Sequence, residues 1–267
     1  MPEGHTLHRL ARDLDAAFAG RRARVSSPQG RFAEGAALLD GAVLLGAEAW
    51  GKQLFVELEG ERFVHVHLGL IGSFDVRSGV AEVPEPIGQV RLRLATDTAY
   101  ADLRGAIICG LVTEAERDAV VARSGPDPLR EDADPDRAWQ RIRRSGAPIG
   151  GLLLDQKVVA GIGNVYRAEL LFRARMDPHR PGSAVPEDEL RALWRDWVKL
   201  LRIGVETGQM LTIDGLRGAR RAAALANRAD RHWVYKREGL PCRRCGTSIA
   251  LETMQGRKLY WCPGCQL

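Results

Sequence analysis

The spacing of apolar residues changes partway along the chain, from an early helix to a long strand-rich region. Between Thr6 and Phe18, apolar side chains recur every three or four positions, which is the spacing of an amphipathic helix. These positions are Leu7, Leu10, Ala11, Leu14, Ala17 and Phe18. We therefore expect a helix almost at the start of the chain, with one face packed on a core.

From about Val43 to Val112 the period shortens to two. Residues 53–58 and 89–94 alternate as half-buried strands do, and residues 62–68 and 106–112 are further strand candidates. Because sheets with one apolar face must bury it, this region predicts a β-sandwich or flattened barrel with the first helix packed on it.

Beyond a loop rich in proline and aspartate, the helical period returns. Helices are predicted over 135–144, 149–159, 163–173 and 186–206. The fold class is therefore α+β with two domains. We predict an N-terminal domain over 1–115, a linker over 116–134 and a helical domain over 135–235. Residues 209–235 show poor periodicity and are predicted to form a flexible loop.

Four of the five cysteines form a module in the last 32 residues, 236–267. Cys242 and Cys245 are followed, after sixteen residues, by Cys262 and Cys265. Two C-x2-C pairs at this spacing predict one structural zinc ion with a closed set of four thiolates. The segment between the pairs predicts a hairpin that turns at Gln255-Gly256. Cys109 is predicted to be a buried small apolar residue.

Charge is concentrated at the C-terminal end. Residues 215–267 contain eleven lysines and arginines against three acidic residues, a net charge of +8, whereas the whole chain carries +5. Such a distribution favours a polyanionic partner, most simply nucleic acid, over a merely solvated basic surface. No apolar run reaches the 18–20 residues that a membrane span needs, and no signal peptide is present, so we expect no membrane partner and a cytoplasmic location.

The chain begins Met1-Pro2-Glu3. Removal of Met1 would expose a secondary amine on Pro2, and a terminal amine with a pKa of about 8 is far more often unprotonated than lysine near neutral pH. Such an amine is a ready nucleophile for a sugar aldehyde carbon, and the carboxylate of Glu3 could move protons beside it. By itself this start is common in proteins without such chemistry.

Other polar positions have structural interpretations. Lys52 lies in a tight Trp50-Gly51-Lys52 connection, where a solvated turn lysine is the simplest interpretation. His65 and His67 share one strand face, and we favour packing and hydrogen bonding over metal binding for both. Residues 161–164, Gly-Ile-Gly-Asn, form a turn before a helix, where backbone amides can bind phosphate.

Several motifs together resemble the formamidopyrimidine-DNA glycosylase/endonuclease VIII family. They are Pro2-Glu3-Gly4, Trp50-Gly51-Lys52, His67-Leu68-Gly69-Leu70, Leu154-Asp155-Gln156-Lys157, Gly161-Ile162-Gly163-Asn164 and the C-terminal four-cysteine ribbon. Each is weak alone, but their order covers nearly the whole chain. The resemblance implies a helix–two-turns–helix motif in the second domain and a zinc hairpin after it.

The resemblance also implies a bifunctional DNA glycosylase and AP lyase of base excision repair. Pro2 and Glu3 match its catalytic pair, with Pro2 forming a Schiff base before β,δ-elimination. Lys52 and Arg257 match catalytic residues that contact phosphate. The DNA-contacting matches are Leu70, Arg104, Arg123 and Asn164, and Glu169 matches a structural glutamate near the nucleophile. The resemblance implies a bacterial enzyme that acts as a monomer on DNA of the nucleoid. The implied partner is damaged double-stranded DNA, and the sequence does not decide whether single-stranded or bubble DNA is also used.

Departures from the family pattern favour the endonuclease VIII branch, and hence oxidised pyrimidines as lesions. Arg104 is followed by Gly105-Ala106-Ile107, so the aromatic wedge of the formamidopyrimidine branch is missing. Residues 209–235 show no clear capping loop for purine lesions. Two alternatives stay open from the sequence: an enzyme with AP lyase activity only, and a non-catalytic zinc-ribbon protein that binds damaged DNA.

Overall fold

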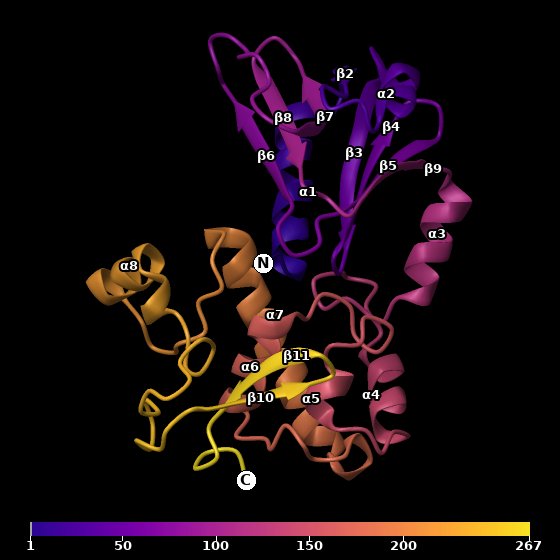
Figure 1. Ribbon diagram of the computed structural model, residues 1–267. Coiled ribbons are helices and arrows are strands. Elements are labelled where there is room, and N and C mark those ends of the chain that lie inside the picture. Colours follow the sequence, from indigo (N-terminus) through magenta and orange to yellow (C-terminus); the bar gives the residue numbers. More distant parts are fainter. Residues whose placement is uncertain (1) are drawn as a thin grey trace. The chain divides into compact units, whose positions relative to one another are not determined.

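The computed structural model describes residues 2–267 and divides into two compact units, one ending at Arg123 and one running from Ser124 to Leu267 (Figure 1). The first unit contains two antiparallel sheets, and the second is mainly helical with one two-stranded hairpin. This arrangement confirms the predicted α+β class. Met1, whose removal was predicted, lies outside the described residues.

The first unit is a β-sandwich. One sheet has the order β1-β3-β4-β5-β9, formed by Arg21–Arg22, Val43–Trp50, Gln53–Leu58, Arg62–His67 and Ile108–Val112. The other has the order β2-β7-β8-β6, formed by Arg24–Ser26, Val90–Ala95, Ala99–Arg104 and Ser73–Ser78. β4 lies where alternation predicted a strand and β5 lies in a further strand candidate, and their antiparallel register opposes Leu54 to Val66 and Phe55 to His65.

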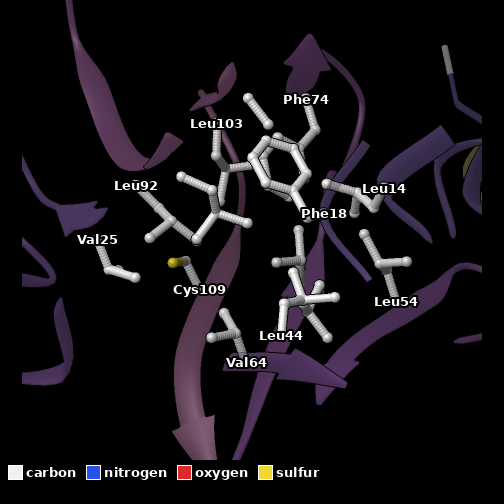
Figure 2. Close-up of a cluster of buried hydrophobic side chains, with 14 of the residues drawn as sticks. Leu14, Phe18, Val25, Leu44, Leu54, Val64, Phe74, Leu92, Leu103 and Cys109 are labelled. Atoms are coloured by element: carbon white, nitrogen blue, oxygen red, sulfur yellow. The ribbon is translucent and has the colours of Figure 1, made fainter. Parts of the chain in front are cut away.

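Helix α1 (Gly4–Phe18) contacts strands of both sheets, and its predicted apolar face closes the sandwich. Leu14 and Phe18 are completely buried there, beside Leu44 and Leu54 of one sheet and Leu103 of the other (Figure 2). Cys109 lies in the same core, as predicted. This packing fixes the position of the residues that precede α1.

Two helices of the first unit were not predicted. Helix α2 (Ala33–Leu39) packs near β2, and α3 (Glu114–Arg123) occupies part of the region predicted to be a linker. None of the residues of α3 is buried, so the helix has no apolar stripe to reveal it. Its start nevertheless carries a capping box, because Thr113 N–H donates to Glu116 Oε2 at 2.8 Å and Glu116 N–H donates to Thr113 Oγ1 at 3.3 Å.

The second unit packs its helices around tryptophans. Its helices are α4 (Pro135–Arg143), α5 (Ile149–Leu152), α6 (Asn164–Arg173) and α7 (Glu187–Thr207), with a 3-10 turn at Gly182–Ala184. Trp139, Trp194 and Trp197 stack edge to face in this core. The predicted helix over 149–159 was too long, since α5 ends at Leu152 and turns follow it.

Residues 209–235 contain helix α8 (Gly218–Ala226) and a 3-10 turn at Arg228–Asp230. After them, β10 (Ala250–Met254) pairs with β11 (Arg257–Trp261) as the predicted hairpin. Gln255 and Gly256 at its turn both have positive φ, 50° and 69°, as a type I′ turn requires. Within the described chain, no helix combines the length and apolar character needed to cross a membrane.

Candidate functional site

The chain around Pro2 and Glu3 is held by the start of α1. Glu3 occupies the N-cap position in an extended conformation, and its carbonyl oxygen accepts a hydrogen bond from Thr6 N–H at 2.8 Å. Its side chain is fully buried and does not cap the helix, while Pro2 is half-buried. The structure thus keeps a buried acid next to residue 2.

Lys52 lies in the tight turn between β3 and β4, where Gly51 has a φ of 58°. It is half-buried and close enough to His67 to influence it: burial lowers the pKa of His67, and the charge of Lys52 lowers it further. His67 Nδ1 accepts a hydrogen bond from Gly69 N–H at 3.0 Å. A neutral imidazole therefore shapes the start of the loop that carries Leu70.

His65 has the structural role expected from the sequence. Its Nε2 lies 2.8 Å from Gln53 Oε1, and its ring stacks on Phe55 with 4.8 Å between ring centroids. Burial lowers the pKa of His65 to about 4. The pair His65 and His67 is therefore occupied by packing and hydrogen bonds within this sheet.

Leu70 belongs to an exposed apolar tip built from two loops. Leu70, Ile71 and Ile107 are exposed by 51%, 89% and 67% of their surface. The loops touch, since a Cβ added to Gly69 would meet Ile107 Cδ1 at 2.4 Å, and Gly69 also has a φ of 69°. Exposed apolar groups gathered in this way mark a contact surface. Ile107 was not predicted to belong to this tip, because only the fold brings the two loops together.

Arg104 is engaged within the first unit. Its Nη2 lies 2.8 Å from Asp102 Oδ2, its Nη1 lies 3.4 Å from Asp75 Oδ2, and both Nε and Nη2 donate to the carbonyl of Ile87. Asp102 is itself buried and paired bidentately with Arg93. The predicted base-facing arginine is thus held by two carboxylates on the four-stranded sheet. Arg123 is exposed in the last turn of α3.

In the second unit, Asn164 joins α6 to the hairpin. Asn164 Nδ2 donates to the carbonyl oxygen of Lys258 at 2.7 Å, and Arg167 donates to that same oxygen at 3.0 Å and to Asn164 Oδ1. Lys258 directly follows Arg257, the exposed first residue of β11. The two predicted phosphate contacts, Asn164 and Arg257, are therefore linked through one backbone carbonyl. Arg167 was missed, although it lies three residues after Asn164 and so on the same helix face.

Glu169 is a buried structural anchor. Its two oxygens accept hydrogen bonds from the backbone N–H groups of Trp233, Val234 and Tyr235, each at 2.8 Å, and from Thr212 Oγ1. The side chain is fully buried in α6. A carboxylate with four donors stabilises the chain on both sides of α8, which ties residues 212 and 233–235 to α6.

The four cysteines of the predicted metal site gather in one place. Their sulfur atoms all lie within 4.8 Å of one another, with 3.9 Å between Cys242 and Cys265 and 3.5 Å between Cys245 and Cys262. Four sulfurs about 2.3 Å from a tetrahedral zinc would be separated by roughly 3.8 Å. The residues therefore fit one structural zinc ion with no open coordination position.

Comparison with known proteins places each part of the chain in one family. Residues 1–107 match the formamidopyrimidine-DNA glycosylase N-terminal domain, residues 124–214 its H2TH domain, and residues 239–267 the zinc finger found in FPG and IleRS. The chain belongs to the formamidopyrimidine-DNA glycosylase/endonuclease VIII family, and it is a DNA glycosylase with AP lyase activity in base excision repair. Its zinc is structural and its partner is DNA.

Among individual relatives, endonuclease 8 1 of Mycobacterium tuberculosis is 50% identical over the full length of both chains. The formamidopyrimidine-DNA glycosylase of Thermus thermophilus is 34% identical over 86% of this chain and 85% of its own. The solved structure of MutM (Fpg) from Thermus thermophilus superposes with a TM-score of 0.76 at 30% identity, covering 99% of this chain and 98% of that one.

Proposed function

We propose that the enzyme removes oxidised bases through a covalent intermediate on Pro2. Once Met1 is removed, the Pro2 nitrogen bonds to C1′ of the damaged nucleotide as the bond from C1′ to the base breaks. Opening of the sugar ring gives an iminium, and Glu3 donates and accepts the protons. β-Elimination then breaks the bond from C3′ to its phosphate oxygen, and δ-elimination breaks the bond at C5′.

The observation that carries this proposal is the buried carboxylate of Glu3 beside Pro2, held at the start of a helix whose apolar face is locked in the core. Precise placement matters because proton transfer requires a group within hydrogen-bond reach. Lys52 would contact phosphate and assist elimination from its turn. Its neighbour His67, kept neutral by burial, would leave the lysine as the local positive charge.

Arg257 and Asn164 would bind the phosphates that flank the lesion, since both belong to the junction of α6 and the hairpin. Leu70 would enter the gap left by the flipped nucleotide, and extrusion of a damaged base is the least costly. Arg104 would face the partner base and Arg123 would contact the backbone. We further propose that the enzyme acts as a monomer in the cytoplasm.

The preferred lesions are proposed to be oxidised pyrimidines, mainly in duplex DNA. The high identity to a protein named endonuclease 8 supports this branch, as does the absence of an aromatic residue at Gly105-Ala106-Ile107. Duplexes containing thymine glycol or 8-oxoguanine, with single-stranded and bubble versions of each, test the assignment. Faster excision of the pyrimidine lesion is expected; faster excision of 8-oxoguanine would reject the lesion class and leave the glycosylase class intact.

The catalytic pair is tested by Pro2→Gly and Glu3→Gln. Each should lower excision of thymine glycol by a factor of 100 or more, because Pro2→Gly alters the proposed nucleophile and a positioned acid–base group such as Glu3 contributes roughly 10²–10⁴. Glu34→Gln is a matched control, because Glu34, like Glu3, lies at the start of a helix of the same unit but is exposed. Loss of excision in the control, or full activity of Glu3→Gln, would contradict the assignment.

A further inference from the structure

Residues 213–230, which we call the basic arm, form a closed loop on the second unit with α8 at its centre (Figure 1). The loop is closed at its base because Thr212 N–H donates to the carbonyl of Arg231 at 3.0 Å, and Thr212 Oγ1 lies 2.9 Å from the same oxygen. The Glu169 carboxylate then ties both ends of the loop to α6. The arm is therefore rooted on the helix that begins with Asn164.

Helix α8 is held in place by Arg231, which lies at the base of the arm. Arg231 Nε donates to the carbonyl of Ala224 at 2.9 Å and its Nη2 donates to that of Leu225 at 2.6 Å, so two carbonyls near the end of α8 are satisfied. Ala224 is the buried residue of this helix. Alanine is the strongest helix former, and five of the nine residues of α8 are alanine. The arm is thus an ordered element with an outward surface.

The outward surface of the arm carries arginines whose charge is not neutralised by nearby carboxylates. Arg217, Arg220 and Arg228 are exposed and Arg221 is half-buried. Across residues 2–267, no ion pair joins any of these four arginines to a carboxylate. The two acidic residues of the arm are used at its base: Asp214 pairs with Arg173 at 2.7 Å, and Asp230 accepts from Asn227 Nδ2 at 2.8 Å.

We propose that the basic arm is an additional binding surface for the DNA phosphate backbone, separate from the phosphate contacts assigned to Asn164 and Arg257. Arg217 is the N-cap residue of α8, and Arg220 and Arg221 lie in its first turn, so three like charges are gathered at one end of the helix. An anion beside them would relieve their mutual repulsion. The established partner is a polyanion, so its phosphates supply that anion. Contacts of this kind raise affinity without reading a base and without touching the reacting sugar.

The test compares two pairs of substitutions in the full-length, zinc-loaded chain. Arg217→Ala/Arg220→Ala removes two charges from the arm and preserves its helix propensity. Arg195→Ala/Arg202→Ala removes two charges from exposed positions on α7. Binding to a 30-base-pair duplex with one tetrahydrofuran site is measured from 50 to 400 mM KCl. This site cannot form a Schiff base, so the result is independent of the chemistry proposed for Pro2.

The arm variant should lower the slope of log affinity against log salt by up to about 1.8, because each phosphate contact contributes about 0.9. The α7 pair should change it by much less, and Arg217→Lys/Arg220→Lys should retain most of the slope. An unchanged slope in the arm variant, or an equal loss of slope in the α7 pair, would overturn the proposal.

Discussion

The sandwich of the first unit and the C-terminal half of the second unit are held together by different interactions. In the sandwich, two sheets and α1 share one apolar core, and burial lowers the pKa of His5 to about 3 and that of His65 to about 4. Beyond α7, a smaller apolar cluster that includes Val234 and Tyr260 is supplemented by charged groups: the Glu169 carboxylate, Arg173 between Asp196 and Asp214, and Arg244 stacked on Phe172 and Trp233. A metal site completes this second region.

The difference explains where each region can place its chemistry. A closely packed core resists small displacements, which suits a nucleophile and an acid that must be held within hydrogen-bond reach. A region organised by arginines, a zinc site and backbone carbonyls keeps cationic groups at its surface, which suits the binding of phosphates. Removing the metal and the polar anchors in turn tests whether the two regions are stabilised in these different ways.

Removal of zinc should have the largest effect. Cys262→Ser, or treatment with a chelator, should unfold the hairpin and abolish tight DNA binding, because structural zinc contributes about 10–16 kcal/mol in finger peptides. The first unit should stay folded, since its core cluster contains none of the four zinc ligands. Near-ultraviolet circular dichroism and zinc release report the change. Cys109→Ala is the matched control, and it should retain zinc. Unfolding of the sandwich on chelation would contradict the independence of the first unit from the metal.

Glu169→Gln should have the next largest effect. The amide nitrogen would replace one of the two carboxylate oxygens and so oppose either Trp233 N–H or the N–H groups of Val234 and Tyr235, which leaves a buried donor unsatisfied, at a cost of about 3 kcal/mol. Amide hydrogen exchange at these three residues should accelerate. Glu189→Gln, which removes only a surface pair with Arg180, should change stability by about 1 kcal/mol or less. Equal effects of the two substitutions would refute the role of Glu169 as an anchor.

A change of pH should affect the stability of the two regions differently, by a smaller amount than the substitutions above. Burial lowers the pKa of His65 to about 4, so the unfolded chain binds more protons between that value and 6.5, and stability falls as the pH falls through this window. The pKa of His179 is raised despite desolvation, because Asp177 and Glu252 accept its hydrogen bonds. Its contribution is complete below pH 6.5 and is lost as the pH rises through the folded-state pKa.

Thermal unfolding of His65→Gln and His179→Gln from pH 4.5 to 8 checks these signs. The His65 variant should lose less stability on acidification than the wild type. The stability of the His179 variant should no longer decline as the pH rises. Parallel pH curves for wild type and both variants would contradict the difference between the regions.

Local patterns in the sequence predicted the elements whose packing is local. Helix α1, strands β4 and β5, and the zinc hairpin all carry a clear period or a specific turn, and the structure confirms them. Helix α3 lacks an apolar stripe, and only its capping box could have revealed it. The role of Glu169 could not be predicted from the sequence, because its carboxylate accepts hydrogen bonds from backbone groups 64 to 66 residues away and no local pattern specifies such a contact.

The central claim, that Pro2 is the nucleophile, is tested most directly by locating the covalent adduct. The enzyme is incubated with DNA containing an abasic site in the presence of borohydride, digested, and its peptides are analysed by mass spectrometry. We predict that Met1 is absent and that the reduced sugar remnant is attached to the nitrogen of Pro2. An adduct on Lys52 or another lysine, or no adduct with a chain that lacks Met1, would contradict the account.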